Sequence, residues 1–545
     1  MKSFRHHPLV CVLIPLLALC GSLRADVKPS ALFSEGAVLQ QGVPIPVWGT
    51  ARAGEKVTVR LNEQEATTTA GKNGKWMVHL PPREAGGPFV MTISGNNTVT
   101  IGDVLVGEVW VAVGQSNMDF GLGGASNADT EIPLAKYPKL RFFSVGHKNA
   151  VIPQTELEGH WVGCSPEIAG RFSAVSYFFG RDIHKMRSVP VGMIVSSWCG
   201  TPGQAWSSLD ALQKDPQLAT YADVAQRLAS GYPHAARMYP QRFAKYWEAF
   251  TKWNDRYGKP YDNNLKAWVS ESEKAKTEGA PVPPQPIPGA YPPLPPESLD
   301  ADESMPKTPA VLFNGMIAPL IPYAIKGMIW YQGEGNAHKA LEYQTLFPCL
   351  IADYREKWQR GNFPFLFVQI APCDRMVPEI REAQFLTLGK SPNTAMAVIT
   401  DVGEAKNIHP KKKEPVGVRL ALAARALAYG ESIEYSGPLF QSMKIEGNRA
   451  ILTFGHTGNG MVAKEGEIKG FIIAGADGKF VSAKAGIVGD TIVVSSPEVA
   501  TPVAVRYGWD NVPDVNLYNK EGLPASPFRT DCPLPEPIAK EQRNL

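Results

Sequence analysis

The fold of this chain is decided by the stretch Glu108-Val-Trp-Val-Ala-Val-Gly-Gln-Ser-Asn-Met118. Residues 109–113 are a short, β-branched apolar run of the kind that forms a buried strand. The run breaks at Gly114, and Ser116 follows where the strand gives way to a loop or helix. A serine at such a break can point its hydroxyl from a rigid sheet edge into a cleft. Because Gly, Ser and Asn are also ordinary turn residues, the stretch alone favours a plain turn.

The surrounding sequence alternates between strand-like and helix-like segments from about residue 104 to 430. Apolar runs typical of strands cover 109–113, 140–145, 191–197, 325–331, 365–370 and 395–400, and helical patterns cover 173–185, 340–359, 378–388 and 415–429. Near-continuous apolar strands separated by amphipathic helices predict an α/β domain with a mostly parallel sheet covered on both faces.

Two regions of short strands and Gly, Asn or Pro turns flank this domain. Residues 26–103 and 431–545 are each predicted to form a β-sandwich domain. An insertion at about 204–310 interrupts the α/β pattern. Its first part is polar, aromatic and helical in pattern, and its proline-rich part, 281–296, predicts a stiff extended segment. We interpret the insertion either as a surface decoration or as a lid or wall beside a substrate.

Residues 1–25 have the pattern of a secretory signal peptide, with a basic start, an apolar run at 9–19 and a cleavage site after Ala25. The apolar run is too short for a membrane span, and the bulky Leu19 before Cys20 disfavours a lipid anchor. The sequence therefore predicts a secreted or periplasmic protein without a transmembrane span.

Composition excludes several functional classes. A net charge of +3 in 545 residues is too small to argue for a nucleic-acid partner. Outside the signal, the cysteines are scattered, without a C-x-x-C pair or Cys/His metal spacing, so we expect neither a metal site nor a disulfide scaffold. One or two disulfide bridges stay open as an alternative. These cysteines are Cys164, Cys199, Cys349, Cys373 and Cys532.

Polar clusters follow four of the predicted strands. They are the segments 114–117, 198–203, 332–336 and 401–410. In an open α/β sheet, ligands bind beyond the carboxyl ends of the strands. The four clusters could thus converge on one rim, and this joint placement favours a catalytic interpretation of Ser116.

Ester hydrolysis by a serine requires a base that takes up the hydroxyl proton. His409 is the best candidate because it lies on a loop after a strand and just before a helix, a placement that the other histidines beyond the signal lack. Asp401, at the strand end, is our candidate for the residue that orients the imidazole. The rival interpretation is a Ser–His dyad in which a backbone carbonyl holds the imidazole.

The attacked carbonyl becomes an oxyanion, which needs preorganised donors. We expect the backbone N–H groups of Ser116 and Gly200, and the side-chain amide of Gln332, to supply them. Glu334 could serve as a glycosidase carboxylate, but no paired second carboxylate is identifiable, which favours a structural role. The further candidates for oxyanion or substrate binding are Gln115, Asn117 and Glu334.

Several motifs together resemble the sialate O-acetylesterase family of SGNH-type (GDSL-like) esterases. They are Gly-Gln-Ser-Asn-Met (114–118), Ser-Ser-Trp-x-Gly-Thr-Pro (196–202), Ile-Trp-Tyr-Gln-Gly-Glu-x-Asn (329–336) and Ile-His-Pro-Lys-x-Lys (408–413). The resemblance implies a three-layer α/β/α esterase domain without a metal or cofactor, which removes acetyl groups from sugar hydroxyls. It implies that Ser116 is the nucleophile, His409 the base, and Gly200 and Gln332 oxyanion donors.

Two positions depart from the family's pattern. Cys199 stands where the family usually has a glycine, and Lys406 stands where SGNH enzymes often place the acid of the triad. The expected partner is an acetylated carbohydrate. Alternatives are an acetylxylan-type esterase and a non-catalytic glycan-binding protein, and the motifs leave the sugar, the acetyl position and the oligomeric state open.

Overall fold

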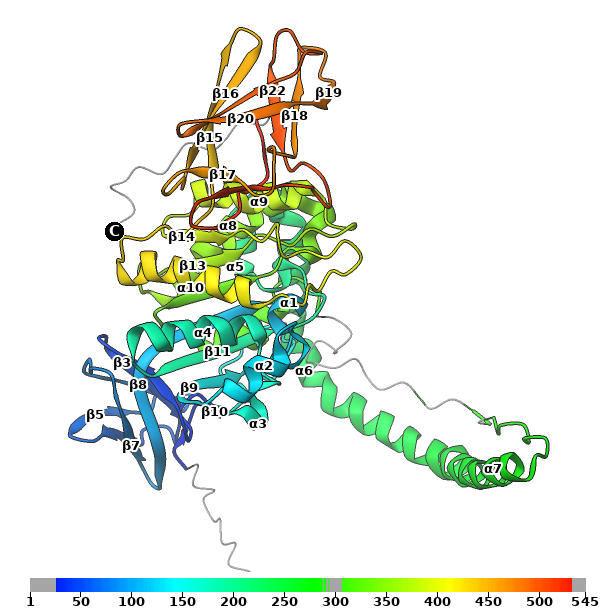
Figure 1. The fold of residues 1–545 in the computed structure, drawn as a ribbon. Helices are drawn as coiled ribbons and strands as arrows, with labels where there is room; N and C mark the ends of the chain where they lie inside the picture. The colour runs from blue at the N-terminus through cyan, green and yellow to red at the C-terminus, as the bar shows by residue number, and fades with distance from the viewer. Residues whose placement is uncertain (1–25, 288, 291–292, 294–305, 532–545) are drawn as a thin grey trace, which may run out of the picture.

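The computed structural model describes residues 26–287, 289–290, 293 and 306–531 (Figure 1). The predicted signal peptide, Cys532 and part of the proline-rich segment 281–296 lie outside the described residues. The chain forms a mixed α/β structure with several sheets. In Figure 1 the first strands lie at the lower left, the last strands at the top and a helical arm at the lower right.

A parallel sheet forms the centre of the molecule. Its strand order is β10-β9-β11-β8-β12-β13-β14, and only β10 pairs antiparallel within this series. The strands are β8 (Thr98–Gly114), β9 (Tyr137–Ser144), β10 (Trp161–Cys164), β11 (Val191–Ser197), β12 (Gly327–Tyr331), β13 (Phe365–Val368) and β14 (Thr394–Ala397). The predicted apolar runs thus form the expected strands.

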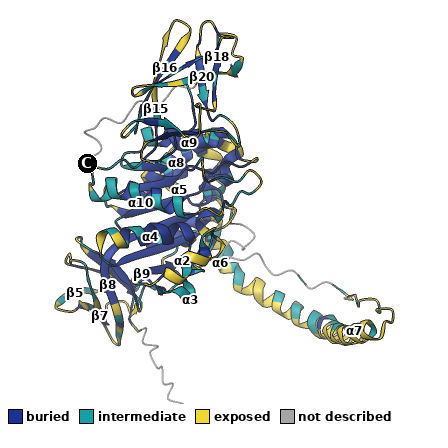
Figure 2. Ribbon diagram, in the orientation of Figure 1, coloured by how far each residue is buried: buried dark blue, intermediate teal, exposed yellow. Residues whose placement is uncertain are grey.

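The central strands are apolar on both sides because helices cover both faces. Val111 and Trp330 belong to the core that includes helix α8 (Ala340–Trp358) and helix α9 (Pro378–Lys390). Ala112 and Ile329, their neighbours along β8 and β12, belong to the core that includes α4 (Ala174–Arg187) and α10 (Glu414–Tyr429). Successive side chains of a strand point to opposite faces, so this alternation defines three layers, α/β/α (Figure 2). Shorter helices are α1 (Ser116–Asp119), α2 (Ala128–Glu131), α3 (Pro166–Ala169) and α5 (Leu209–Gln213).

The first strands of the chain continue into the central sheet. Strand β8 is 17 residues long: its first half pairs with β7 and β2, and its second half pairs with β11 and β12. The predicted boundary between residues 103 and 104 therefore lies inside one strand, and the division of the chain into domains stays a proposal. The other strands of this region are β1 (Lys28–Pro29), β2 (Val38–Gln40), β3 (Ile45–Thr50), β4 (Lys56–Leu61), β5 (Gln64–Thr69), β6 (Lys75–Leu80) and β7 (Gly86–Ser94).

The C-terminal region forms three small sheets around their own apolar core. It contacts helix α9 through an ion pair between Arg529 and Glu382, 2.7 Å from Nε to Oε1. Its strands are β15 (Leu439–Glu446), β16 (Arg449–Gly455), β17 (Met461–Ala463), β18 (Phe471–Ala474), β19 (Phe480–Ser482), β20 (Lys484–Val488), β21 (Thr491–Ser495), β22 (Ala504–Tyr507), β23 (Leu517–Asn519) and β24 (Phe528–Arg529).

The first part of the insertion is largely helical, as its sequence predicts. Helix α6 (Ala219–Trp253) and helix α7 (Lys259–Glu278) extend away from the body of the molecule (Figure 1). The arm carries exposed apolar side chains such as Trp247, whose side chain stacks between Phe243 and Phe250. Because the arm points outward, it does not form a lid over the sheet in this structure. No helix in the described part of the chain is long and apolar enough to span a membrane.

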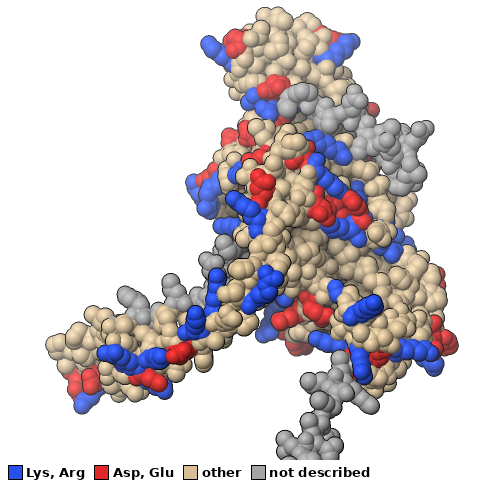
Figure 3. Space-filling model, turned by 180° about the vertical axis from the view of Figure 1, so that it is seen from behind, with Lys and Arg blue, Asp and Glu red and all other residues tan. Residues whose placement is uncertain are grey.

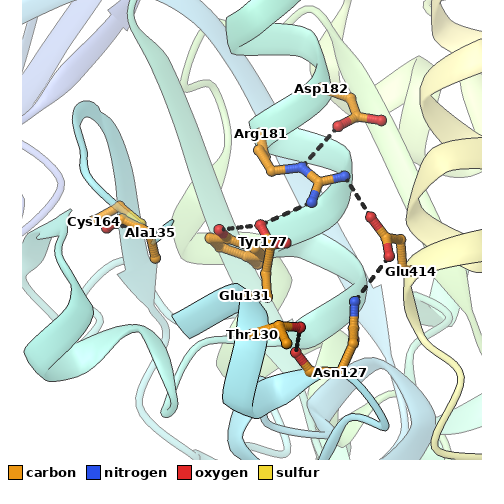
Figure 4. A network of polar contacts seen from close by, with 9 residues as sticks. All are labelled: Asn127, Thr130, Glu131, Ala135, Cys164, Tyr177, Arg181, Asp182 and Glu414. Atoms are coloured by element: carbon orange, nitrogen blue, oxygen red, sulfur yellow. Dashed lines mark hydrogen bonds and ion pairs between the residues drawn. The ribbon is translucent and has the colours of Figure 1, made fainter. Parts of the chain in front are cut away.

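An ion-pair network around the buried Arg181 side chain joins α4 to α10 and α2 (Figure 4). The guanidinium of Arg181 contacts Glu131 at 2.8 Å, Asp182 at 2.9 Å and Glu414 at 2.9 Å. Tyr177 also donates a hydrogen bond to Glu131 at 2.8 Å. The network fixes the first turn of α10, because Glu414 is the first residue of that helix. Elsewhere, charges of both signs are interspersed, as on the face in Figure 3.

Candidate active site

Ser116 lies at the carboxyl end of the central strand β8, where α1 begins. The last residue of β8, Gly114, pairs with Ser197 of β11 on one side and with Tyr331 of β12 on the other. A side chain at Gly114 would collide with the backbone of Tyr331, because an added Cβ would lie only 2.2 Å from its carbonyl oxygen. The sheet thus holds Ser116 at the rim where α/β proteins bind ligands.

His409 lies on the loop between β14 and α10, and its Nε2 is 2.8 Å from the Oγ of Ser116. The loop is held by its own side chains. The Asn407 carboxamide accepts from the His409 N–H at 3.0 Å and donates to the His409 carbonyl at 2.9 Å. Glu404 accepts hydrogen bonds from Asn407 and from the Lys411 N–H. A hydroxyl in contact with an imidazole in this way can give up its proton as it attacks a carbonyl.

The environment of His409 favours its neutral form. Partial burial lowers the pKa of His409 below 6.5, and the positive charges of Lys413 and Arg375 lower the pKa further. A neutral imidazole can accept a proton, whereas an imidazolium cannot, so these influences preserve the capacity of His409 to act as a base.

The predicted binding residues Asn117 and Glu334 are buried behind Ser116. The Asn117 Nδ2 donates to Glu334 Oε1 at 2.6 Å and to the Ile408 carbonyl at 2.9 Å. The Asn117 Oδ1 accepts from Lys413 Nζ at 2.5 Å. Burial raises the pKa of Glu334. Since Asn117 and Lys413 have no solvent exposure and Glu334 has 8%, these three side chains brace the site from inside.

Gly200 occupies the exposed loop after β11, with a φ of +69° that strongly favours glycine. Its neighbour Cys199 is also exposed, and the thiol donates to Asp119 of α1 at 3.4 Å. Partial desolvation of the thiol and the adjacent carboxylate of Asp119 raise the pKa of Cys199 to about 11, so the thiol is protonated at neutral pH. Asp119 also accepts from the Ser197 hydroxyl at 2.8 Å. Asp119 thus links α1 to the loop that carries Gly200.

The side chains of Gln332 and Gln115 hold loops together. The Gln332 amide donates to the Thr201 carbonyl at 3.3 Å and to Asn336 Oδ1 at 2.8 Å, and it is fully buried. Both of its N–H groups therefore have partners, which argues against the predicted oxyanion role for this amide. The Gln115 Oε1 accepts from the Gly335 N–H at 3.0 Å, and Gln115 is 3% exposed.

The structure does not bring Asp401 to His409. Asp401 forms a two-point ion pair with Arg419, with both N–O distances at 2.7 Å. Among the described residues, none forms a hydrogen bond with Nδ1 of His409. Asp401 is thus engaged elsewhere, and the arrangement favours the dyad interpretation over the predicted triad. The sequence could not distinguish a dyad from a triad, because Asp401 and its ion-pair partner Arg419 both lie close to the His409 loop in the chain.

The substitution Asp401→Asn is expected to change kcat for acetate release by less than about 10-fold. Loss of the acid of a Ser-His-Asp triad lowers kcat by about 10⁴-fold, so the two interpretations predict clearly separate values. The measurement is steady-state hydrolysis of p-nitrophenyl acetate, with circular dichroism to verify folding. A fall of about 10³-fold or more in a folded variant would restore Asp401 as the third member.

Sequence reasoning assigned no role to three residues around the site. Lys413 is the last residue of the motif at 408–413, and this membership was the available signal. In the structure it is buried at the N-cap of α10, where a cation opposes the helix dipole. Asp119 gave no signal beyond its position near Ser116. The ring of His147 stacks on Trp198, with centroids 4.2 Å apart, and this contact joins segments that are far apart in sequence.

Comparison with known proteins gives concordant matches. Residues 312–427 match the family model described as carbohydrate esterase, sialic acid-specific acetylesterase. Sialate O-acetylesterase of Rattus norvegicus is 31% identical over 536 residues, covering 88% of this chain and 90% of the relative. The Homo sapiens sialate O-acetylesterase is 30% identical over 540 residues, covering 88% of each. A crystal structure of a carbohydrate acetylesterase from Xanthomonas citri has a TM-score of 0.75 and 34% identity, covering 93% of this chain and 99% of that one.

The α/β sheet with a Ser–His pair at its rim and these matches define a carboxylic ester hydrolase. More narrowly, the chain belongs to the sialate O-acetylesterase family.

Proposed function

We propose that this protein is a secreted carbohydrate O-acetylesterase that uses Ser116 as its nucleophile and His409 as its base. The observation that carries the proposal is the 2.8 Å contact between Ser116 Oγ and His409 Nε2 at the carboxyl end of the central strand. Secretion is supported by the signal-peptide pattern of residues 1–25. The family assignment supports an acetylated sugar as the substrate, with sialic acid as the leading candidate.

The proposed reaction has two halves. Ser116 Oγ attacks the acetyl carbonyl carbon while His409 Nε2 takes the hydroxyl proton, and a tetrahedral oxyanion forms. The imidazolium then gives this proton to the sugar oxygen, the bond between the acetyl carbon and that oxygen breaks, and acetyl-serine remains. Water, deprotonated by His409, attacks the acetyl-serine and releases acetate, which restores the serine.

Backbone donors are the proposed stabilisers of the oxyanion. Ser116 is the first residue of α1, so its N–H lies among the groups that have no partner within the helix. Gly200 lies on the exposed loop after the neighbouring strand, and Asp119 links that loop to α1. Because the Gln332 amide is engaged, we assign the oxyanion to the N–H groups of Ser116 and Gly200.

Acetate release from a panel of substrates tests the function. The panel contains O-acetylated sialic acids, acetylated xylan and p-nitrophenyl acetate, and a fluorophosphonate probe with peptide mapping identifies the labelled residue. We expect acetate from at least one glycan and labelling of Ser116. Preference for xylan would favour the acetylxylan-type alternative. Binding of glycans without acetate release or labelling would favour the non-catalytic alternative and contradict the proposal.

The pH dependence of kcat/KM should report the lowered pKa of His409. The base must be neutral, and its pKa lies below the ordinary 6.5, so activity is retained as the pH falls to 6.5 and is lost only below that. The measurement is hydrolysis of p-nitrophenyl acetate across about pH 4.5 to 8 in overlapping buffers. An acidic limb centred above 6.5 would contradict this assignment.

A further inference from the structure

A single carboxamide connects the two halves of the Ser–His pair. Asn117 directly follows Ser116, and the Asn117 Nδ2 donates at 2.9 Å to the carbonyl of Ile408, which directly precedes His409. The orientation of this carboxamide therefore affects the distance between the hydroxyl and the imidazole. Any group that fixes the carboxamide also fixes the reacting pair.

Lys413 is the group that fixes the other end of this carboxamide. Its ammonium donates to Asn117 Oδ1 at 2.5 Å, which orients the amide so that Nδ2 faces Glu334 and Ile408. A carboxamide whose oxygen and nitrogen both have charged partners cannot flip without losing both bonds. The buried lysine and glutamate thus act on Asn117 from opposite sides.

The position of Lys413 is a costly one for a lysine side chain. The side chain has no solvent exposure, and it stands at the N-cap of α10, where the helix dipole is positive. Burial lowers the pKa of Lys413 to about 7. The aromatic rings of Phe120 and Tyr331 lie 4.7 Å and 5.4 Å from its Nζ and offer their faces to the cation. Such a costly placement is typical of a functional site.

We propose that Lys413 is a positioning residue of the esterase, which locks Asn117 between the Ser116 and His409 segments. The proposal rests on the proposed function of Ser116 and His409. It also explains how a dyad can operate without an acid on the imidazole, because orientation comes from the backbone on both sides of the pair.

The charged groups around this network define the expected pH effect. The charge of Lys413 interacts with the carboxylates of Glu334 and Glu404, and the charges of Lys413 and Arg375 act on His409. Removal of the Lys413 charge leaves Arg375 as the remaining cation acting on His409. The pKa of His409 should then rise toward 6.5, so the acidic limb of kcat/KM should move to higher pH.

The test compares Lys413→Met with Lys412→Met, a matched control on an exposed neighbour. For p-nitrophenyl acetate we expect Lys413→Met to lower kcat by about 10- to 100-fold, with KM nearly unchanged, because misplacement of a reacting pair costs a rate of this order. The acidic limb should move to higher pH in this variant only. Wild-type kcat, or a reduced kcat with an unshifted acidic limb, would overturn the proposal.

A second variant guards against misfolding caused by the uncompensated Glu334. Lys413→Met combined with Glu334→Gln removes both buried charges, and the upward shift of the acidic limb should persist in it. If neither variant folds by circular dichroism, Lys413 is structural and the proposal fails. The wild-type protein distinguishes failure of the Lys413 proposal from failure of the proposed function. If the wild type hydrolyses the ester and is labelled at Ser116, the proposed function stands whatever the lysine variants show.

Discussion

Replacement of Ser116 by alanine is expected to lower kcat for acetate release by about 10⁴-fold or more, because no other group can form the acetyl intermediate. The loss should appear in kcat with little change in KM, since the hydroxyl contributes to bond making rather than to binding the sugar. The measurement is acetate release from an acetylated sugar and from p-nitrophenyl acetate. Fluorophosphonate labelling should disappear in the same variant.

Two observations make the result of Ser116→Ala decisive. Ser270→Ala, on the exposed surface of α7, is the control and should keep wild-type activity and labelling. The Ser116→Ala variant should unfold at the same denaturant concentration as the wild type. Alanine is tolerated at the first position of a helix, and among the described residues the Ser116 hydroxyl hydrogen-bonds only to His409. A folded alanine variant with unchanged turnover would refute the nucleophile assignment.

The largest effect on stability is expected from Arg181→Met. This variant leaves Glu131 without its cation in a nearly enclosed site, where its side chain is 12% exposed. Removal of one member of a buried ion pair costs about 3–5 kcal/mol in the free energy of unfolding, and the partial exposure of Glu414 reduces this to about 2–3 kcal/mol. The measurement is the shift of the unfolding midpoint in guanidinium chloride.

The exposed pair Arg60–Glu65 supplies the matched control for Arg181. Its side chains are 62% and 42% exposed, so Arg60→Met should change the free energy of unfolding by less than about 1 kcal/mol. Equal destabilisation by the two variants would mean that the network in Figure 4 is no stronger than a surface pair. Because Glu414 follows Lys413 in the chain, the Arg181 variant should also lose activity before it unfolds.

The central sheet was predictable from sequence because its strands are buried on both faces. Val111 and Ala112 are neighbours that enter different apolar cores, so the run carries no polar alternation and stands out in the sequence. The convergence of the strand ends was also predictable. Strands buried on both faces are typical of a parallel sheet, and parallel strands place their carboxyl ends on one rim. The sequence pattern therefore predicts the pairing of Ser116 and His409, which are 293 positions apart in the chain.

The roles of polar residues around that pair were less predictable. Asn117, Glu334 and Gln332 all follow strands, which marks them as near the site but does not tell whether they face the substrate or the interior. Their hydrogen-bond partners come from other loops, and the burial that decides their role depends on tertiary packing. Asp401 illustrates the same limit of sequence patterns. Arg419 lies more than one turn into α10, and it forms an ion pair with Asp401 that the sequence pattern does not indicate.

The continuity of strand β8 has a consequence for how the molecule unfolds. Its backbone pairs with the first β-region at one end and carries Ser116 just beyond the other. Amide groups along such a strand belong to neighbouring cooperative units, so disorder that starts among the early strands can spread along β8 toward the serine. The early strands contain none of the candidate catalytic residues. Their stability nevertheless helps to keep Ser116 in position for the reaction.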